Sequence, residues 1–99
     1  MTDILPGMSN AAPDNLLSVD QLTVYGADWC PDCRRTKRWL DANEVDYAWV
    51  DRDADPSIKR ALAEAGYLAI PVVVFPDGRI LVEPSDAAMA EATAVTAAG

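Results

Sequence analysis

The stretch Trp29-Cys30-Pro31-Asp32-Cys33 decides how this chain folds, because it holds both cysteines of the sequence and separates two backbone patterns. Residues 22–25, before it, alternate apolar and polar side chains as a strand does. Residues 34–43, after it, repeat their apolar positions at the spacing of one helix face. Pro31 suits the first turn of a helix, where its missing N–H is no loss. The first cysteine is therefore expected where a strand gives way to a helix.

A cysteine in that place can become a nucleophile, because a helix N-terminus offers partial positive charge and free backbone N–H groups to a thiolate. We expect Cys30 to lie at the helix tip and point outward, and Cys33 to point toward the protein. Arg34 and Arg35 add full positive charges about one turn further on and are our candidate thiolate-stabilising residues. Asp32 opposes them with a carboxylate between the two sulfurs.

The remaining chain reads as alternating strands and helices. The second strand, 45–51, is apolar on both faces, which predicts a place in the interior of the sheet. A helix follows from Pro56, capped by Asp55, and ends near Gly66. Turn residues at 76–78 predict a hairpin. The further predictions are a loop that runs into a continuous apolar strand within residues 67–75, a strand at 79–83, and a last helix at 86–97 capped by Ser85.

This order, βαβαββα, predicts an α/β fold with a four-stranded mixed sheet and three flanking helices. Residues 1–19 contain repeated turn and breaker residues without sustained periodicity, so we predict a flexible N-terminal leader. Residues 20–99 then form one domain, since 99 residues are too few for two.

Composition excludes several classes of function. A formal charge of −8 argues against a nucleic-acid groove, which needs a basic face. No apolar run approaches the roughly 20 residues of a membrane span, and the N-terminus lacks the pattern of a signal peptide, so we expect a cytoplasmic protein without membrane contact. Histidine is absent, so no imidazole can act as a base or bind metal. Two cysteines alone supply half of a usual zinc site, and we expect no metal site.

These motifs together resemble the thioredoxin superfamily on its glutaredoxin side, in particular the mycoredoxins and NrdH-redoxins. The resemblance runs from about residue 20 to residue 98. It rests on the strand before the two cysteines, on Ile70-Pro71 before an apolar strand, on Pro76-Asp77-Gly78 in the hairpin, and on Pro84-Ser85-Asp86 before the last helix. It implies a thioredoxin fold and a monomeric dithiol–disulfide oxidoreductase that acts on disulfide-containing or thiolated proteins.

The resemblance also assigns residues. Cys30 attacks, Cys33 resolves, and the bond before Pro71 is cis, which places the Ile70 backbone beside Cys30 for pairing with an extended substrate. For Asp86 two roles stay open, as a helix cap or as the partner of a substrate amino group. The candidate substrate-binding residues are Trp29, Pro31, Asp32, Ile70, Pro71, Ser85 and Asp86.

No cofactor is expected to be bound, so electrons must come from an external reductant. Glutathione-using relatives usually have a basic residue at the place of Ala27, Thr-Val-Pro at the place of 69–71, and a Gly-Gly pair near 83–84. Because these features are missing, we expect mycothiol, or a flavin reductase (thioredoxin reductase with NADPH), to be the donor in preference to glutathione.

Two other classes of function remain open on the same fold. In the first, the two cysteines act as a redox switch that a partner reads. In the second, the protein carries an iron–sulfur cluster or a metal, with thiols from outside completing the ligand set. The alternative without a redox function is a purely structural disulfide, and a reducing compartment disfavours it.

Overall fold

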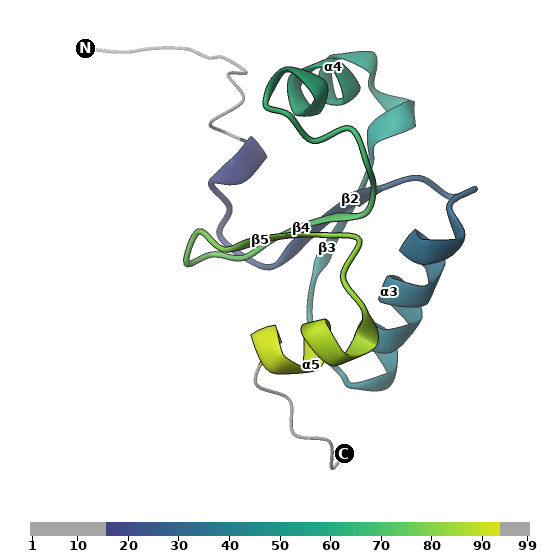
Figure 1. Cartoon of the computed structure of the whole chain (residues 1–99), viewed down its shortest axis with the longest axis vertical. Coiled ribbons are helices and arrows are strands. Elements are labelled where there is room, and N and C mark those ends of the chain that lie inside the picture. The colour runs from purple at the N-terminus through teal and green to yellow at the C-terminus, as the bar shows by residue number, and fades with distance from the viewer. Residues whose placement is uncertain (1–15, 94–99) are drawn as a thin grey trace.

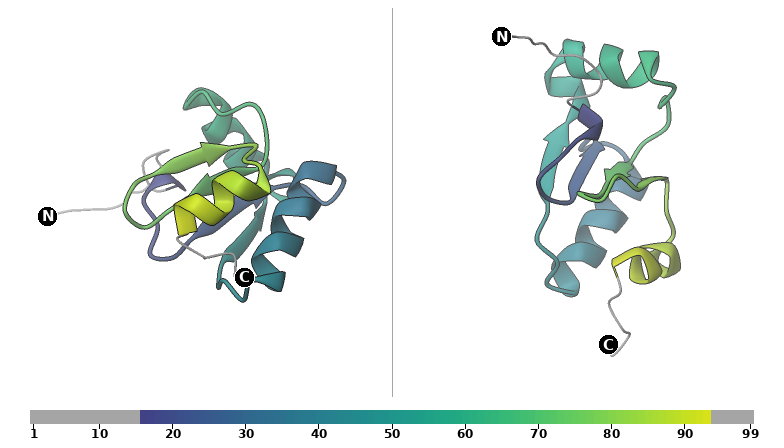
Figure 2. Two further views of the ribbon diagram at one scale, coloured as in Figure 1. Left: turned by 60° about the horizontal axis from the view of Figure 1, so that its bottom comes forward. Right: turned by 90° about the vertical axis from the view of Figure 1, so that its left-hand side faces the viewer.

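The computed structural model describes residues 16–93 and shows one mixed sheet between two layers of helices (Figure 1). The strands lie in the order β3-β2-β4-β5. Figure 2 shows α4 on one face of the sheet and α3 and α5 on the other. Along the chain the elements are β2 (Thr23–Gly26), α3 (Pro31–Ala42), β3 (Ala48–Asp51), the 3-10 turn η1 (Arg52–Ala54), α4 (Pro56–Glu64), β4 (Val72–Val74), β5 (Ile80–Val82) and α5 (Asp86–Thr93). The predicted fold class and order of elements are confirmed.

Strand directions follow from the connections. β2 and β3 are joined through α3 and run parallel, with Val24 opposite Trp49. β4 pairs antiparallel with both β2 and β5, and Val73 stands opposite Val24 and Leu81. The hairpin turns at Gly78, whose φ of +97° suits a residue without Cβ.

β3 lies at the edge of the sheet, so the prediction of an interior strand is wrong. Its side chains are apolar on both faces because helices cover both faces, not because strands flank it. Trp49 packs into one core cluster and Val50 into the other. β3 is also shorter than the predicted strand 45–51, since its pairing with β2 begins only at Ala48.

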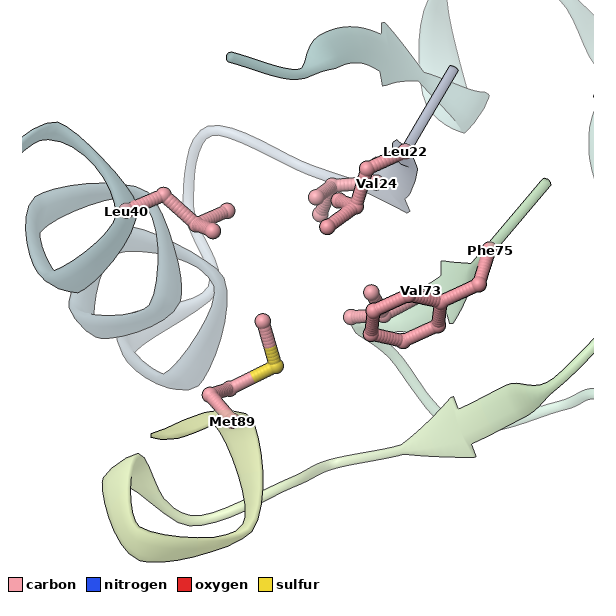
Figure 3. Close-up of a cluster of buried hydrophobic side chains, with 6 residues drawn as sticks. All are labelled: Leu22, Val24, Leu40, Val73, Phe75 and Met89. Atoms are coloured by element: carbon pink, nitrogen blue, oxygen red, sulfur yellow. The ribbon is translucent and has the colours of Figure 1, made fainter. Parts of the chain in front are cut away.

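Two hydrophobic clusters hold the layers together, one on each face. The first joins the sheet to α3 and α5 and consists of Leu22, Val24, Leu40, Val73, Phe75 and Met89 (Figure 3). The second joins it to α4 and consists of Tyr25, Leu62, Val72 and Val74. Because successive residues of a strand point to opposite faces, Val73 serves the first cluster while its neighbours serve the second.

Side-chain caps set the starts of the later helices, as predicted. The Asp55 carboxylate accepts a hydrogen bond from the Ser57 amide (3.0 Å) at the start of α4. The Ser85 hydroxyl accepts one from the Ala88 amide (3.0 Å) at the start of α5. α4 ends at Glu64, and Gly66 follows with φ +95°. The predicted end of the last helix, near residue 97, lies outside the described residues.

The end of the predicted leader packs on the domain. Leu16, Leu17 and Val19 lie against the second cluster, and the Tyr25 hydroxyl donates a hydrogen bond to the Leu16 carbonyl (2.7 Å). Packing against the sheet is therefore already present at residue 16, three residues before the predicted boundary. The rest of the predicted leader, residues 1–15, lies outside the described residues.

Candidate active site

Cys30 is the N-cap residue of α3, the position that the sequence predicts. Its backbone is extended (φ −85°, ψ 117°) and Pro31 occupies the first turn. The Cys30 Sγ accepts a hydrogen bond from the Cys33 amide (3.1 Å), as an N-cap side chain does. One of the free N–H groups of the helix is thus aimed at the sulfur. The amide of Asp32, also in the first turn of the helix, makes no hydrogen bond to the Cys30 sulfur.

A buried wall faces Cys30 across the site. The Ile70–Pro71 peptide bond is cis, and the Ile70 carbonyl oxygen lies 3.9 Å from the Cys30 Sγ, close enough to accept the thiol proton. Cys30 forms a cluster with Ala27, Cys33 and Ile70 and is only 5% exposed. The prediction that Cys30 points outward is therefore wrong in this structure, because the Ile70 backbone covers the helix tip.

Cys33 lies deeper and is fully buried. Burial, together with its hydrogen bond to the Cys30 thiol, raises the pKa of Cys33 to about 12. An interaction with Ala27 and the positive charge of Arg52 act in the opposite direction. At neutral pH Cys33 is therefore a protonated thiol. Both cysteines are free in this structure.

Trp49 and Gly26, which were not among the predicted site residues, enclose Cys33. Trp49 packs against the cysteine cluster, and the Lys37 ammonium lies 3.9 Å from the centre of its ring. Gly26 leaves room for the sulfur, since a Cβ there would lie 2.7 Å from Cys33 Sγ. The only feature of the sequence that could have indicated this role for Gly26 is its place directly after a strand that leads to a cysteine.

Two large apolar side chains are exposed close in the chain to residues of the site, one next to Cys30 and one two residues before Ile70. Trp29 is 60% exposed, and its indole N–H donates a hydrogen bond to the Asp53 carboxylate (2.7 Å). Leu68 is 72% exposed, and its carbonyl accepts a hydrogen bond from Arg52 (3.3 Å). Arg52 and Asp53 both belong to η1, so this turn contacts both the Trp29 side chain and the Leu68 backbone. The sequence showed η1 only as an acidic loop.

Arg34 and Arg35 are both engaged away from the sulfur. Arg34 donates to the Asp28 carbonyl (3.1 Å). Arg35 donates to the Asp32 carboxylate (3.0 Å) and to the Pro84 carbonyl (2.7 Å). Neither forms a hydrogen bond with Cys30, so any stabilisation of its thiolate by these two residues acts at a distance. The charge of Asp32, which opposes a thiolate, is paired with Arg35.

The two residues at the start of α5 have different roles. Ser85 caps the helix through its hydroxyl, whereas Asp86 forms an ion pair with Arg35 at 3.5 Å. The alternative in which Asp86 itself caps the helix is therefore wrong. The structure thus brings together Cys30, Cys33 and Ile70, with Pro71 next to Ile70. Trp29, Pro31 and Asp32 adjoin the cysteines in the chain, whereas Asp86, with Ser85 before it, is connected to Asp32 only through Arg35.

The residues described, 16–93, contain no group of three or more acidic or cysteine side chains arranged to hold a metal ion. Within the same part of the chain, no helix has the length and apolar character needed to cross a membrane.

Comparisons with known proteins agree with this geometry. The glutaredoxin family profile matches residues 22–81, so the chain belongs to the glutaredoxin family, with the thioredoxin fold. It is 32% identical over 66 residues to mycoredoxin 1 of Corynebacterium glutamicum, covering 67% of this chain and 84% of that protein. The redox character of the family and the resemblance to mycoredoxins and NrdH-redoxins are thereby confirmed.

Two solved structures show the same arrangement. The glutaredoxin of Archaeoglobus fulgidus superposes with a TM-score of 0.61 at 25% identity, covering 72% of this chain and 83% of that one. The NrdH-redoxin of Escherichia coli, a glutaredoxin-like protein, superposes with a TM-score of 0.58 at 27% identity, covering 63% and 80%.

Proposed function

We propose that this protein is a dithiol–disulfide oxidoreductase in which Cys30 attacks and Cys33 resolves. The observation that carries the proposal is the asymmetry of the two thiols. Both thiols are buried, but Cys30 is 5% exposed and has a backbone N–H of the helix N-terminus directed at its sulfur, whereas Cys33 is fully buried and protonated. A thiolate is the attacking species in thiol–disulfide exchange, so the first step falls to Cys30.

The cycle has two exchanges. The Cys30 thiolate attacks a substrate disulfide, forms a mixed disulfide and releases one substrate thiolate. Cys33 then attacks the Cys30 sulfur, its proton passes to the departing second thiolate, and a Cys30–Cys33 disulfide remains. Two electrons have moved to the substrate, and an external reductant must return them.

The surroundings of Cys33 suit this order. Burial is the main cause of the raised pKa of Cys33, and Cys30 raises it further through a hydrogen bond and through its charge when ionised. Once Cys30 is part of a mixed disulfide, its charge and its proton are gone. The pKa of Cys33 is then expected to fall by the part that Cys30 contributes, although burial still raises it.

For the substrate and the donor we retain the expectations from the sequence. The substrates are proteins with a disulfide or with a cap of low-molecular-weight thiol, and the donor is mycothiol or thioredoxin reductase with NADPH. The resemblance to mycoredoxin 1 supports the first donor. The second is supported by the E. coli NrdH-redoxin, whose structure is described as the basis of a thioredoxin-like activity profile. We propose that the protein works as a monomer in the cytoplasm.

Turnover tests the proposal. Oxidised protein is offered glutathione, mycothiol, or thioredoxin reductase with NADPH, each coupled to the reduction of a model protein disulfide. Catalytic turnover is expected with mycothiol or the reductase, with loss of all turnover in Cys30→Ser. In Cys33→Ser the mixed disulfide should accumulate. Wild-type protein that fails with every donor, or Cys30→Ser that keeps its rate, would overturn the proposal.

A further inference from the structure

We propose that Arg35 determines which disulfides reach Cys30, because it occupies two carboxylates, Asp32 and Asp86, that would otherwise attract a cationic substrate. The protein then favours neutral or anionic disulfides over those that carry an ammonium group beside the sulfur. This inference rests on the proposed function, since it concerns substrates of the same thiol.

Arg35 joins three segments with one guanidinium group. Nη1 lies 3.0 Å from Oδ1 of Asp32, in the same helix, and Nη2 donates to the carbonyl oxygen of Pro84 at 2.7 Å. Nε lies 3.5 Å from Oδ1 of Asp86, at the start of α5. Across residues 16–93, neither Asp32 nor Asp86 forms an ion pair with any other cation.

This cluster is linked to the surroundings of the reactive sulfur at two points, although Arg35 itself forms no hydrogen bond with Cys30. Asp32 stands between the two cysteines in the chain. On the other side, the amide of Glu83, next to Pro84, donates to the Pro71 carbonyl at 2.9 Å. Pro71 follows Ile70, whose carbonyl lies 3.9 Å from Cys30 Sγ. A substrate group that flanks its disulfide toward α5 therefore meets the Arg35 cluster.

The contacts of Arg35 differ in strength. The Asp32 and Pro84 contacts are hydrogen bonds, whereas Nε is shielded from water and makes no hydrogen bond, even to Asp86. The Asp86 contact is thus the one that a substrate ammonium can displace most readily. Asp86 is half-exposed, so water and salt screen the pair, and we expect effects of about three- to tenfold on rate ratios.

The neighbouring charges do not provide the same control. Arg34 is bound to the Asp28 carbonyl, and Arg52 pairs with Asp53. Arg38, one turn beyond Arg35 on α3, is exposed and makes no ion pair or side-chain hydrogen bond in the described part of the chain. Arg38→Met therefore removes the same charge as Arg35→Met without touching either carboxylate, and is the matched control.

The test uses three small disulfides that differ in charge. These are bis(2-aminoethyl) disulfide, bis(2-hydroxyethyl) disulfide and 3,3′-dithiodipropionate. Fully reduced protein is mixed with an excess of each, and the reduced fraction is followed by acid quench and mass spectrometry. The readout is the ratio of the cationic to the neutral rate constant, which a general loss of activity leaves unchanged.

In Arg35→Met the ratio should rise about three- to tenfold over wild type, and Arg35→Met with Asp86→Asn should return it toward the wild-type value. Asp86→Asn alone removes one of the two carboxylates paired with Arg35. The cluster then becomes more positive, so the ratio of the cationic to the neutral rate constant should fall. High salt should reduce each difference. Arg38→Met should stay within about twofold of wild type because its charge is distant and screened.

Three results would overturn the inference. The first is an unchanged ratio in Arg35→Met, and the second is an equal rise in Arg38→Met. The third is an equal fall of all three rate constants in Arg35→Met, which would mean that Arg35 has a structural role only. If Arg35→Met does not fold, Asp86→Asn alone decides, since an unchanged ratio there also contradicts the inference. Failure of the proposed function looks different, because wild-type protein would then react with none of the disulfides at Cys30.

Discussion

The Cys33 sulfur lies so close to the backbone of Gly26 that a Cβ added at Gly26 would be 2.7 Å from it. The ring of Trp49 closes the same space, with its nearest carbon 2.8 Å from that Cβ position. The last residue of β2 therefore sets the depth at which the resolving thiol sits. A larger residue there must displace either the sulfur or the indole.

Gly26→Ala is expected to lower the free energy of unfolding by about 1–3 kcal/mol, the usual range for an overfilled core. Urea denaturation of the reduced protein measures the change. In a Cys33→Ala background the cost should be smaller, because the sulfur is gone and only the Trp49 contact remains. Equal costs in the two backgrounds would show that Gly26 and Cys33 do not share this space.

Stability should fall at alkaline pH because of Cys33. Burial raises the pKa of Cys33 from 9.0 to about 12, so the folded protein keeps a proton that the unfolded chain releases. The Cys33 contribution is therefore complete below pH 9 and is lost as the pH rises toward 12, with a slope of about −1.4 kcal/mol per pH unit.

The measurement is urea denaturation of reduced wild-type and Cys33→Ser protein between pH 7 and about 11. Burial also raises the pKa of Tyr25, which acts in the same direction in both proteins, so the difference between the two curves isolates Cys33. Parallel curves above pH 9 would contradict the raised pKa.

The two thiols should react at very different rates with iodoacetamide at pH 7. Cys30 has a backbone N–H directed at its sulfur, whereas Cys33 is fully buried and protonated. We expect Cys30 to be alkylated at least about tenfold faster. Peptide mapping by mass spectrometry identifies the labelled residue, with denatured protein as the control in which both react. Equal labelling of the folded protein would exclude the proposed roles.

Local signals predicted the framework of the fold. Pro31 and Pro56 mark helix starts, Asp55 and Ser85 cap helices, and Gly78 turns the hairpin. Each of these residues acts on backbone only a few positions away. The sequence therefore predicted the order of elements and the place of Cys30 at a helix N-terminus.

These local signals could not predict contacts between residues that are far apart in the chain. Ile70 covers Cys30 from 40 residues away, and Arg35 reaches Pro84 across 49. Trp29 meets Asp53 across 24. Spacing and propensity imply none of these pairings, because only the packing of the helices on the sheet brings the partners together. The family resemblance alone placed the Ile70 backbone beside Cys30. The burial of Cys30 was missed for this reason, whereas the pairing of Asp32 with Arg35, three residues further along the same helix, is a local contact that the spacing alone could have indicated.

The Tyr25 hydroxyl ties the start of the described chain to the sheet. Tyr25→Phe removes its hydrogen bond to the Leu16 carbonyl (2.7 Å) and should cost about 0.5–1.5 kcal/mol in the free energy of unfolding. Denaturation by urea tests this. Amide hydrogen exchange should also speed up at residues 16–19 and remain slow in β4, whose packing against the Tyr25 ring is kept in phenylalanine. A uniform increase across the sheet would contradict a local anchor.

Glu44 and Glu83 have positive φ angles of 57° and 51°, a conformation that costs a residue with a Cβ about 1–2 kcal/mol. Glycine relieves this cost but loses about 0.5–1 kcal/mol through the greater freedom of the unfolded chain. Each Glu→Gly change should therefore stabilise the protein by about 0.5–1 kcal/mol, while Glu→Ala, which keeps the Cβ, should not.

Thermal denaturation of the four variants measures these differences. At Glu83 the gain should appear without loss of the link to Pro71, because the amide of residue 83, which donates to the Pro71 carbonyl at 2.9 Å, is kept in glycine. A gain in Glu44→Gly combined with a loss in Glu83→Gly would mean that the Glu83 side chain itself stabilises the segment between Pro71 and Arg35. Equal effects of Gly and Ala at both positions would contradict the backbone explanation.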